Sequence, residues 1–189
     1  MHVCEIYKAD VGNGTGMRVS LFVSGCTIHC KGCFNEKTWD FNHGELWTQE
    51  LEDSLIKELS RPYYKGLSIL GGEPFEPQNQ PEICKLILRV KEELPDRNIW
   101  IFTGNKYDVN LIPGGSRYIA DYTDKILDNI DVLVDGPFVQ DLYNIKLNFR
   151  GSENQRIIDM KETRKKGEVV LHPLNEYTPL AEIRKNIGK

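Results

Sequence analysis

The sequence predicts an α/β fold in which mostly parallel strands form an open, partial (βα) barrel or a curved sheet. Four short segments rich in β-branched and aromatic residues recur along the chain: 19–24, 67–70, 99–102 and 132–134. Helical patterns separate them, and this alternation is typical of parallel strands joined by right-handed crossovers. Four such units are too few to close an eight-stranded barrel, which needs roughly 250 residues.

Two amphipathic helices are predicted between these strands, because apolar residues recur there at spacings of three and four. The first spans 48–59, with Thr48 as a suitable N-cap and acidic residues in the first turn. The second spans 81–95, where Pro81 suits a first helical turn and a second proline ends the run. A weaker helix is predicted over 116–129.

The two ends of the chain differ in character. We expect one domain over 1–160, beginning with a strand-like N-terminal stretch and ending in a short strand at 156–160. Residues 161–189 are expected to form a C-terminal extension. Its charge run, 161–166, is typical of solvated surface, and a strand-like segment at 168–172 precedes a polar tail.

The composition is that of an ordinary globular protein. The chain has 189 residues, a net charge of −4, 40% hydrophobic and 28% charged residues. The charge argues against a surface that follows nucleic-acid phosphates, and no apolar run approaches the ~18 residues that span a bilayer. A charged N-terminus is unlike a signal peptide. We therefore expect a cytoplasmic protein that binds neither nucleic acid nor membrane.

Three of the five cysteines form a compact motif. Cys26, Cys30 and Cys33 have the spacing C-x3-C-x2-C, with no fourth cysteine close behind. Clusters that only carry electrons usually have four protein thiolates, and structural zinc sites are closed by four ligands. Three thiolates on one loop therefore favour a four-iron cluster with one iron open to a substrate. Cys4 and Cys84 are expected to be inert, small hydrophobic residues.

Each predicted strand is followed by a loop that can bind a ligand. The first carries the cysteines, the second Gly71–Pro74 (GGEP), the third begins with Thr103, and the fourth begins with Asp135. In parallel α/β folds all of these loops lie at the carboxyl edge of the sheet, where ligands bind. Glycines allow close backbone approach, and Glu73 can accept hydrogen bonds from an ammonium group.

Other interpretations of these loops stay open. Gly71 and Gly72 also suit a tight turn, Thr103 is an ordinary strand-end residue, and Asp135 is equally suited to a cap or turn. His29 or His43 could complete a zinc site with the cysteines, although the spacing fits paired zinc ligands poorly.

With both the cysteine motif and GGEP in view, the chain resembles the radical S-adenosylmethionine enzymes. The residue before Cys33 is usually aromatic in that superfamily, and here it is Gly32. This departure, with Phe34 just after the cysteine, is similar to one branch, the activating proteins of anaerobic ribonucleoside-triphosphate reductase. Further stretches that resemble this branch are NGTGMRVSLFVSGC, NEKTWDFNHGE, GGEPFEPQN, IWIFTG, DVLVDGPFVQDL and FRGSENQRIID. Together they cover about residues 5–160.

The resemblance implies a cofactor set and its contacts. The three motif cysteines would ligate a [4Fe–4S] cluster, and S-adenosylmethionine would chelate the open iron. Implied contacts to S-adenosylmethionine are Gly71, Gly72, Glu73 and Pro74 at the methionyl ammonium, and Gly32, Cys33 and Phe34 at the adenosyl part. Thr103 and Asp135 complete the candidate cofactor-binding set. No general acid or base is demanded.

The resemblance also implies an activity and partners. Reductive cleavage of S-adenosylmethionine would give a 5′-deoxyadenosyl radical that abstracts hydrogen from a glycine Cα of the reductase catalytic subunit. A low-potential donor such as flavodoxin would supply the electron, and residues 138–149 and 150–156 are candidates for partner contact. Two alternatives remain: a radical enzyme acting on a small molecule or on another glycyl-radical enzyme, and a zinc-binding interaction module.

Overall fold

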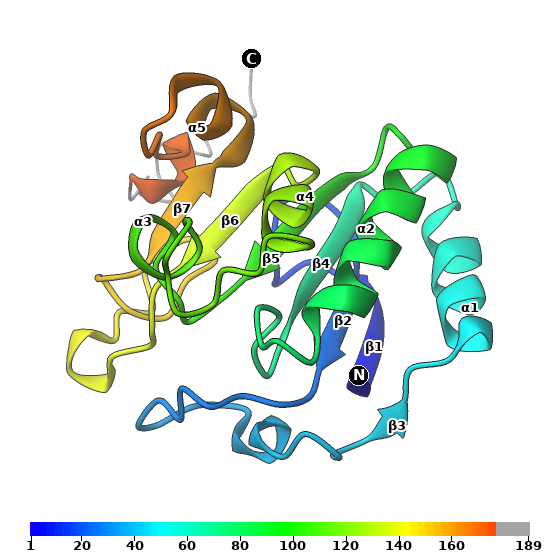
Figure 1. The fold of residues 1–189 in the computed structure, drawn as a ribbon, viewed down its shortest axis with the longest axis horizontal. Helices are drawn as coiled ribbons and strands as arrows, with labels where there is room; N and C mark the ends of the chain where they lie inside the picture. Colours follow the sequence, from blue (N-terminus) through cyan, green and yellow to red (C-terminus); the bar gives the residue numbers. More distant parts are fainter. Residues whose placement is uncertain (177–189) are drawn as a thin grey trace.

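Four parallel strands form the centre of a seven-stranded sheet (Figure 1). They are β2 (Arg18–Val23), β4 (Gly66–Gly71), β5 (Asn98–Phe102) and β6 (Val132–Asp135). The structure is a computed structural model that describes residues 1–176. All four predicted strands are confirmed. Their residues are mostly buried on both faces of the sheet, which explains why they read as continuous apolar runs.

Both flanks of the sheet are antiparallel. β1 (His2–Asp10) pairs with β2 on one side and with the short β3 (Glu45–Leu46) on the other, while β7 (Arg156–Asp159) pairs with β6. The order is β3-β1-β2-β4-β5-β6-β7, so the sheet is open, with β3 and β7 at its edges. The predicted α/β class and the open sheet are confirmed, whereas the predicted partial barrel is not; the parallel strands are confined to the centre of the sheet. The connections from β1 to β2 and from β6 to β7 contain no helix long enough to cross over the sheet. Each pair of strands is therefore antiparallel.

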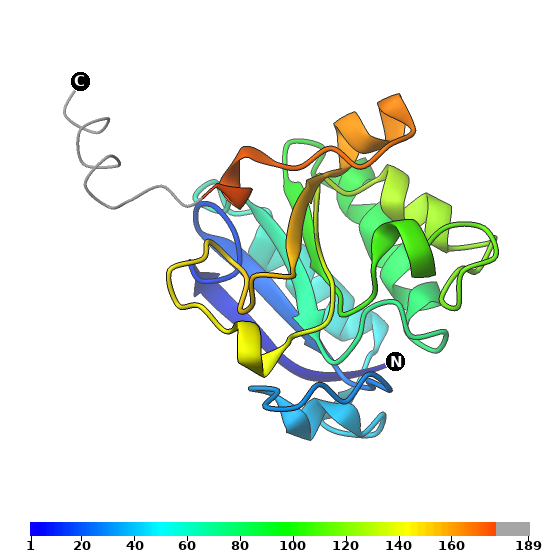
Figure 2. The same cartoon turned by 90° about the vertical axis from the view of Figure 1, so that its left-hand side faces the viewer.

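The two main helices are confirmed and pack on one face of the sheet, opposite the loop that follows β6 (Figure 2). α1 (Gln49–Leu59) begins after Thr48, whose Oγ1 accepts a hydrogen bond from the N–H of Leu51 at 3.3 Å. α2 (Gln80–Glu93) has proline in its first turn. The predicted apolar positions of both helices join the strands in the main core, among them Leu55, Leu59, Ile83, Leu86, Ile87 and Val90.

The helix predicted over 116–129 is much shorter than expected. Only α4 (Thr123–Asp128) is helical, and an unpredicted short helix, α3 (Tyr107–Asn110), lies before it. The reason is tertiary. The N–H of Arg117 donates to the carbonyl of Asn110, and its carbonyl accepts from the side chain of Gln80, so these groups are not available to a helical ladder.

The C-terminal part confirms two expectations and corrects a third. The strand predicted at 156–160 is present as β7, and the charge run forms α5 (Met160–Lys166), mostly exposed but with Thr163 buried. The strand predicted at 168–172 is wrong: this segment makes only an isolated bridge at Leu171. Two backbone hydrogen bonds make this bridge, from the N–H of His172 to the carbonyl of Ile157 and from the N–H of Asp159 to the carbonyl of Val170. The side chain of Asn175 bonds the N–H of Ile157, so no further backbone bond forms at that N–H. The polar tail beyond 176 lies outside the described residues.

Three short 3-10 helices, η1 (Glu36–Trp39), η2 (Gln140–Leu142) and η3 (Pro173–Asn175), complete the elements. Among residues 1–176, no helix is long and apolar enough to cross a membrane.

The carboxyl ends of the central strands point toward the lower part of Figure 1, where the segment carrying the three motif cysteines crosses below the sheet. The strand-end loops therefore meet at one edge, as predicted.

Candidate metal centre

The cysteine loop leaves β2 through a backbone conformation that needs glycine. Gly25 has a φ of 93°, and a Cβ there would lie within 2.5 Å of two ring atoms of Phe41. The N–H of Gly25 donates to the carbonyl of Thr38 at 2.8 Å, and that of Cys26 to the carbonyl of Trp39 at 3.2 Å. The start of the loop is therefore fixed to η1.

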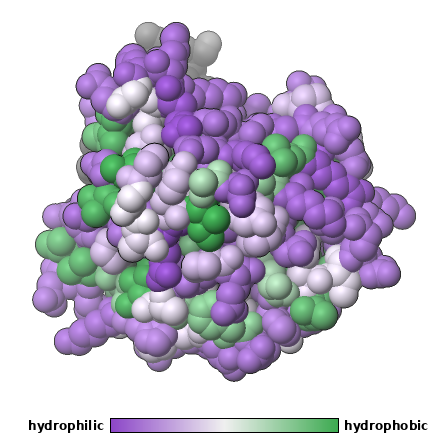
Figure 3. Space-filling view, in the orientation of Figure 1, coloured by the Kyte–Doolittle hydropathy of each residue, from purple (hydrophilic) through white to green (hydrophobic). Residues whose placement is uncertain are grey.

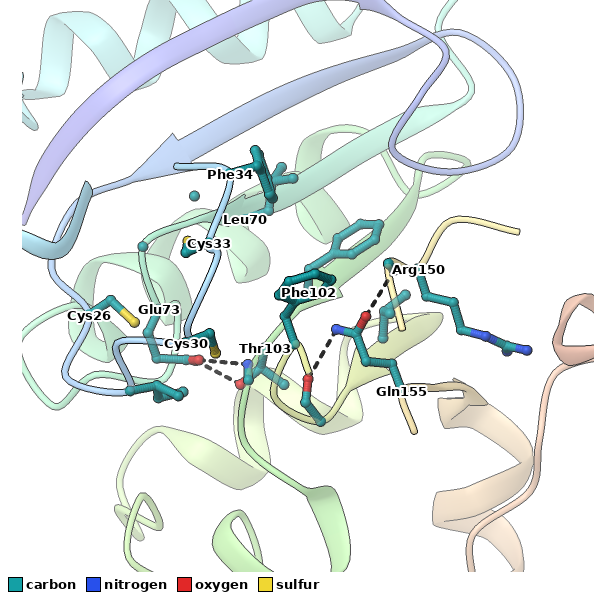
Figure 4. A pocket seen from close by; sticks show the side chains of 18 of the residues that line it. Cys26, Cys30, Cys33, Phe34, Leu70, Glu73, Phe102, Thr103, Arg150 and Gln155 are labelled. Atoms are coloured by element: carbon teal, nitrogen blue, oxygen red, sulfur yellow. Dashed lines mark hydrogen bonds between the residues drawn. The ribbon is translucent and has the colours of Figure 1, made fainter. Parts of the chain in front are cut away.

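All three motif cysteines line one cavity of about 610 Å³ (Figure 4). Their thiols are free, and Cys26 is buried while Cys30 and Cys33 are half-buried. Burial raises the pKa of the Cys26 thiol to about 11 and also raises the pKa of Cys30. Because a thiol must lose its proton to bind a metal, metal binding by these cysteines would release protons. Within the described part of the chain, no group of three His, Cys, Asp or Glu side chains is already gathered to hold a single metal ion.

The GGEP loop lies directly against the cysteine loop. The N–H of Glu73 donates to the carbonyl of Gly25 at 2.8 Å, and the Asn79 side chain bridges the carbonyls of Ser24 and Glu73 at 3.0 Å each. A Cβ at Gly72 would lie 2.5 Å from the carbonyl oxygen of Gly25. Glycine at this position is thus what permits the contact between the two loops.

Glu73 joins the second loop to the third. Its Oε1 accepts hydrogen bonds from Thr103 Oγ1 at 2.7 Å and from the N–H of Phe75 at 2.8 Å, and its Oε2 accepts from the N–H of Gly104 at 2.9 Å (Figure 4). Burial raises the pKa of this carboxyl to about 7, against the lowering effect of these bonds. The side chain expected to meet an ammonium group therefore also holds the site together.

The predicted site residues divide into two groups. Those lining the shared cavity are Cys26, Cys30, Gly32, Cys33, Phe34, Gly71, Gly72, Glu73 and Thr103. Pro74 and Asp135 do not line it. Asp135 is fully buried, and its carboxylate accepts from Arg156 at 2.5 and 2.9 Å and from the N–H of Tyr107 at 2.8 Å. That bonding is structural, because it holds α3 and β7 to the end of β6.

Comparison with known proteins agrees with this geometry. Residues 12–158 match a family model described as a 4Fe-4S single cluster domain. Over 158 residues, 82% of this chain and 96% of the relative, the chain is 42% identical to the anaerobic ribonucleoside-triphosphate reductase-activating protein of Escherichia coli K12. The chain belongs to the family of anaerobic ribonucleoside-triphosphate reductase-activating proteins. The chain is also 43% identical to the activating protein of Vibrio cholerae and 39% identical to that of phage T4. Each alignment covers 83% of this chain, and they cover 97% and 93% of the two relatives, respectively.

The donor set fits the iron–sulfur cluster that this activating-protein family implies. Cys26, Cys30 and Cys33 supply three free thiols from one short loop to the same cavity. The N–H of Asn35 donates to the Sγ of Cys33 at 3.4 Å, the kind of contact that tunes cluster potential. The segment after β6 lies against the cysteine loop, because a Cβ at Gly32 would lie 3.1 Å from Gln140 Cδ and 3.7 Å from the ring of Phe138. The backbone amide of Phe138 also partly offsets the raised pKa of Cys30.

Sequence reasoning missed the inner wall of the cavity. Leu70, Phe102 and Val134, near the carboxyl ends of three parallel strands, line it together with Phe149 and the amide of Gln155. For Leu70, Phe102 and Val134, the alternation of side chains between the two faces of a strand is a sequence signal that could have indicated this position. Phe149 and Gln155 are contributed by the loop between β6 and β7, whose path the sequence pattern does not specify.

Proposed function

We propose that this protein cleaves S-adenosylmethionine reductively to activate anaerobic ribonucleoside-triphosphate reductase. A bound [4Fe–4S] cluster supplies the electron for a cleavage that yields methionine and a 5′-deoxyadenosyl radical, which takes a hydrogen atom from a glycine Cα of the reductase. The observation that carries the proposal is the direct contact between the cysteine loop and the GGEP loop on the wall of one cavity.

Each part of the cavity wall has a role in this proposal. Cys26, Cys30 and Cys33 hold the cluster and leave one iron open. The GGEP loop binds the methionyl ammonium, with Glu73 and Thr103 fixing its shape through their 2.7 Å hydrogen bond. Phe34 is 84% exposed at the cavity and offers its ring to the adenosyl part. The apolar inner wall excludes water from the reacting atoms.

The loop between β6 and β7 is proposed to meet the reductase. Leu142, Tyr143 and Ile145 expose 40%, 54% and 82% of their surface there, and Tyr143 also lines the cavity. Hydrophobic residues gather along the left and lower-left of the molecular face in Figure 3, the side on which this loop lies in Figure 1. A peptide loop of the partner placed across these residues would bring its glycine to the cavity. The electron would come from a low-potential donor such as flavodoxin.

The test is anaerobic incubation of the iron-loaded protein with S-adenosylmethionine, a reductant and the reductase catalytic subunit. A glycyl signal in electron paramagnetic resonance, with 5′-deoxyadenosine formed, is expected. A cluster that cleaves S-adenosylmethionine only when a small molecule is added would instead favour a small-molecule radical enzyme. Zinc without sulfide in the purified protein would contradict both.

A further inference from the structure

A second acidic residue of the loop between β4 and α2 reaches the cysteine loop. Glu76 is 2% exposed, and its Oε1 accepts hydrogen bonds from the N–H of Thr27 at 2.8 Å and from the Thr27 hydroxyl at 2.7 Å. Thr27 directly follows Cys26. A buried carboxylate is thus hydrogen-bonded to both the backbone and the side chain of the residue next to the first predicted iron ligand.

Arg117 holds this carboxylate in place. Its guanidinium lies 3.2 Å from each oxygen of Glu76 and also donates to the hydroxyl of Thr27. The backbone of Arg117 is itself fixed, because its carbonyl accepts from the buried Gln80 side chain at 2.8 Å and its N–H donates to Asn110 at 3.0 Å. Without Arg117, Glu76 would be a buried and unpaired charge, which is strongly unfavourable.

We propose that Glu76, held by Arg117, is the positioning residue that fixes Cys26 relative to the GGEP loop. Both neighbours of Cys26 are hydrogen-bonded to the loop between β4 and α2. The carbonyl of Gly25 accepts from the N–H of Glu73, and the N–H of Thr27 donates to the Glu76 carboxylate. This inference rests on the proposed function for its purpose. S-adenosylmethionine must reach the open iron and the GGEP loop together, and an error of about an ångström between them is costly.

Thr27 gives the cleanest test, because the side chain is exposed and its replacement leaves the core intact. Thr27→Val removes the hydroxyl that bonds Glu76 and Arg117, whereas Thr27→Ser keeps it. In anaerobically reconstituted protein without S-adenosylmethionine or reductase, we expect the Val variant to lose iron to a chelator roughly tenfold faster than wild type, as expected for a lost hydrogen bond to a charged group. The Ser variant should match wild type.

A second pair of variants separates positioning from general stability. Glu76→Gln is compared with Glu52→Gln, since Glu52 is also buried and lies 3.0 Å from an arginine, Arg89, but its side chain contacts residues of α2 and not the cysteine loop. Both variants should melt at lower temperature, and only Glu76→Gln should lose iron faster and weaken the change that S-adenosylmethionine causes in the spectrum of the reduced cluster. Equal iron loss from the two variants, or wild-type behaviour of Thr27→Val, would overturn the inference. A wild-type cluster that ignores S-adenosylmethionine would refute the proposed function instead, and the chelator comparison would still decide the role of Glu76.

Discussion

A methyl group at position 72 tests whether the cysteine loop and the GGEP loop must touch. In Gly72→Ala the new Cβ would lie 2.5 Å from the carbonyl oxygen of Gly25 and 2.9 Å from that of Thr38. Both are main-chain atoms, so neither can move aside by a change of rotamer. The φ of Gly72 lies outside the left-handed region, and the substitution therefore adds crowding without backbone strain.

The magnitude follows from the size of the overlap. Ordinary contacts of a Cβ begin at 3.4 Å, so the methyl group is 0.9 Å (3.4 − 2.5) too close to the Gly25 oxygen. Overpacking of this kind costs about 1–3 kcal/mol, and the smaller unfolded-state entropy of alanine offsets about 0.4–1 kcal/mol of it. We expect a net loss of about 1–2 kcal/mol in the free energy of unfolding. Relief of the clash would also lengthen the 2.8 Å bond from Glu73 to Gly25.

Two measurements check this prediction: urea denaturation of the cluster-free protein, and iron content after anaerobic reconstitution. Gly12→Ala is the matched control, because its Cβ would meet only Asp10 Oδ1 at 3.4 Å and its φ is also outside the left-handed region. Gly72→Ala should unfold at lower urea and retain less iron than this control. If the two variants unfold at the same urea concentration and retain the same iron content, the contact between the loops does not require glycine at position 72.

Three further changes address the ligands, the acid stability and the partner surface. Cys30→Ala should lose the cluster and all cleavage of S-adenosylmethionine, while Cys84→Ala, in the core, should keep about four irons per chain; iron analysis showing the reverse would mean that the ligand set is wrong. Burial alone would raise the pKa of Asp131, but bonds from Lys161, the N–H of Ile99 and Lys91 outweigh it and lower the pKa. Its stabilising contribution is therefore present above the ordinary aspartate pKa of about 3.9 and is lost as pH falls below it, so Asp131→Asn should flatten the acid limb of a plot of melting temperature against pH. Ile145→Glu should raise the reductase concentration needed for half-maximal glycyl signal about tenfold, with partner-independent cleavage unchanged; the same effect from Leu88→Glu on α2 would argue for nonspecific charge repulsion.

The candidate cluster ligands and the meeting of the loops around them could be read from the sequence because their signals are local. A C-x3-C-x2-C run needs no knowledge of the fold, and β-branched segments followed by glycine-rich loops place those loops at one sheet edge by topology alone. Asp135 shows the limit of this reasoning. It follows a strand as a ligand contact should, yet its carboxylate is taken by Arg156, 21 residues later in the chain. No sequence pattern around Asp135 or Arg156 predicts this ion pair.

Sequence by itself determined the open α/β architecture, the three thiols and the family to which the chain belongs. Only the tertiary structure decided that Glu73 spans two loops, that Glu76 and Arg117 fix the residue after Cys26, and that the segment predicted as a helix before α4 is mostly irregular. The physical reason is range. Periodicity and motif spacing reflect forces between near neighbours, whereas the Arg117–Thr27 bond joins residues 90 positions apart, and such a contact exists only once the whole sheet has formed.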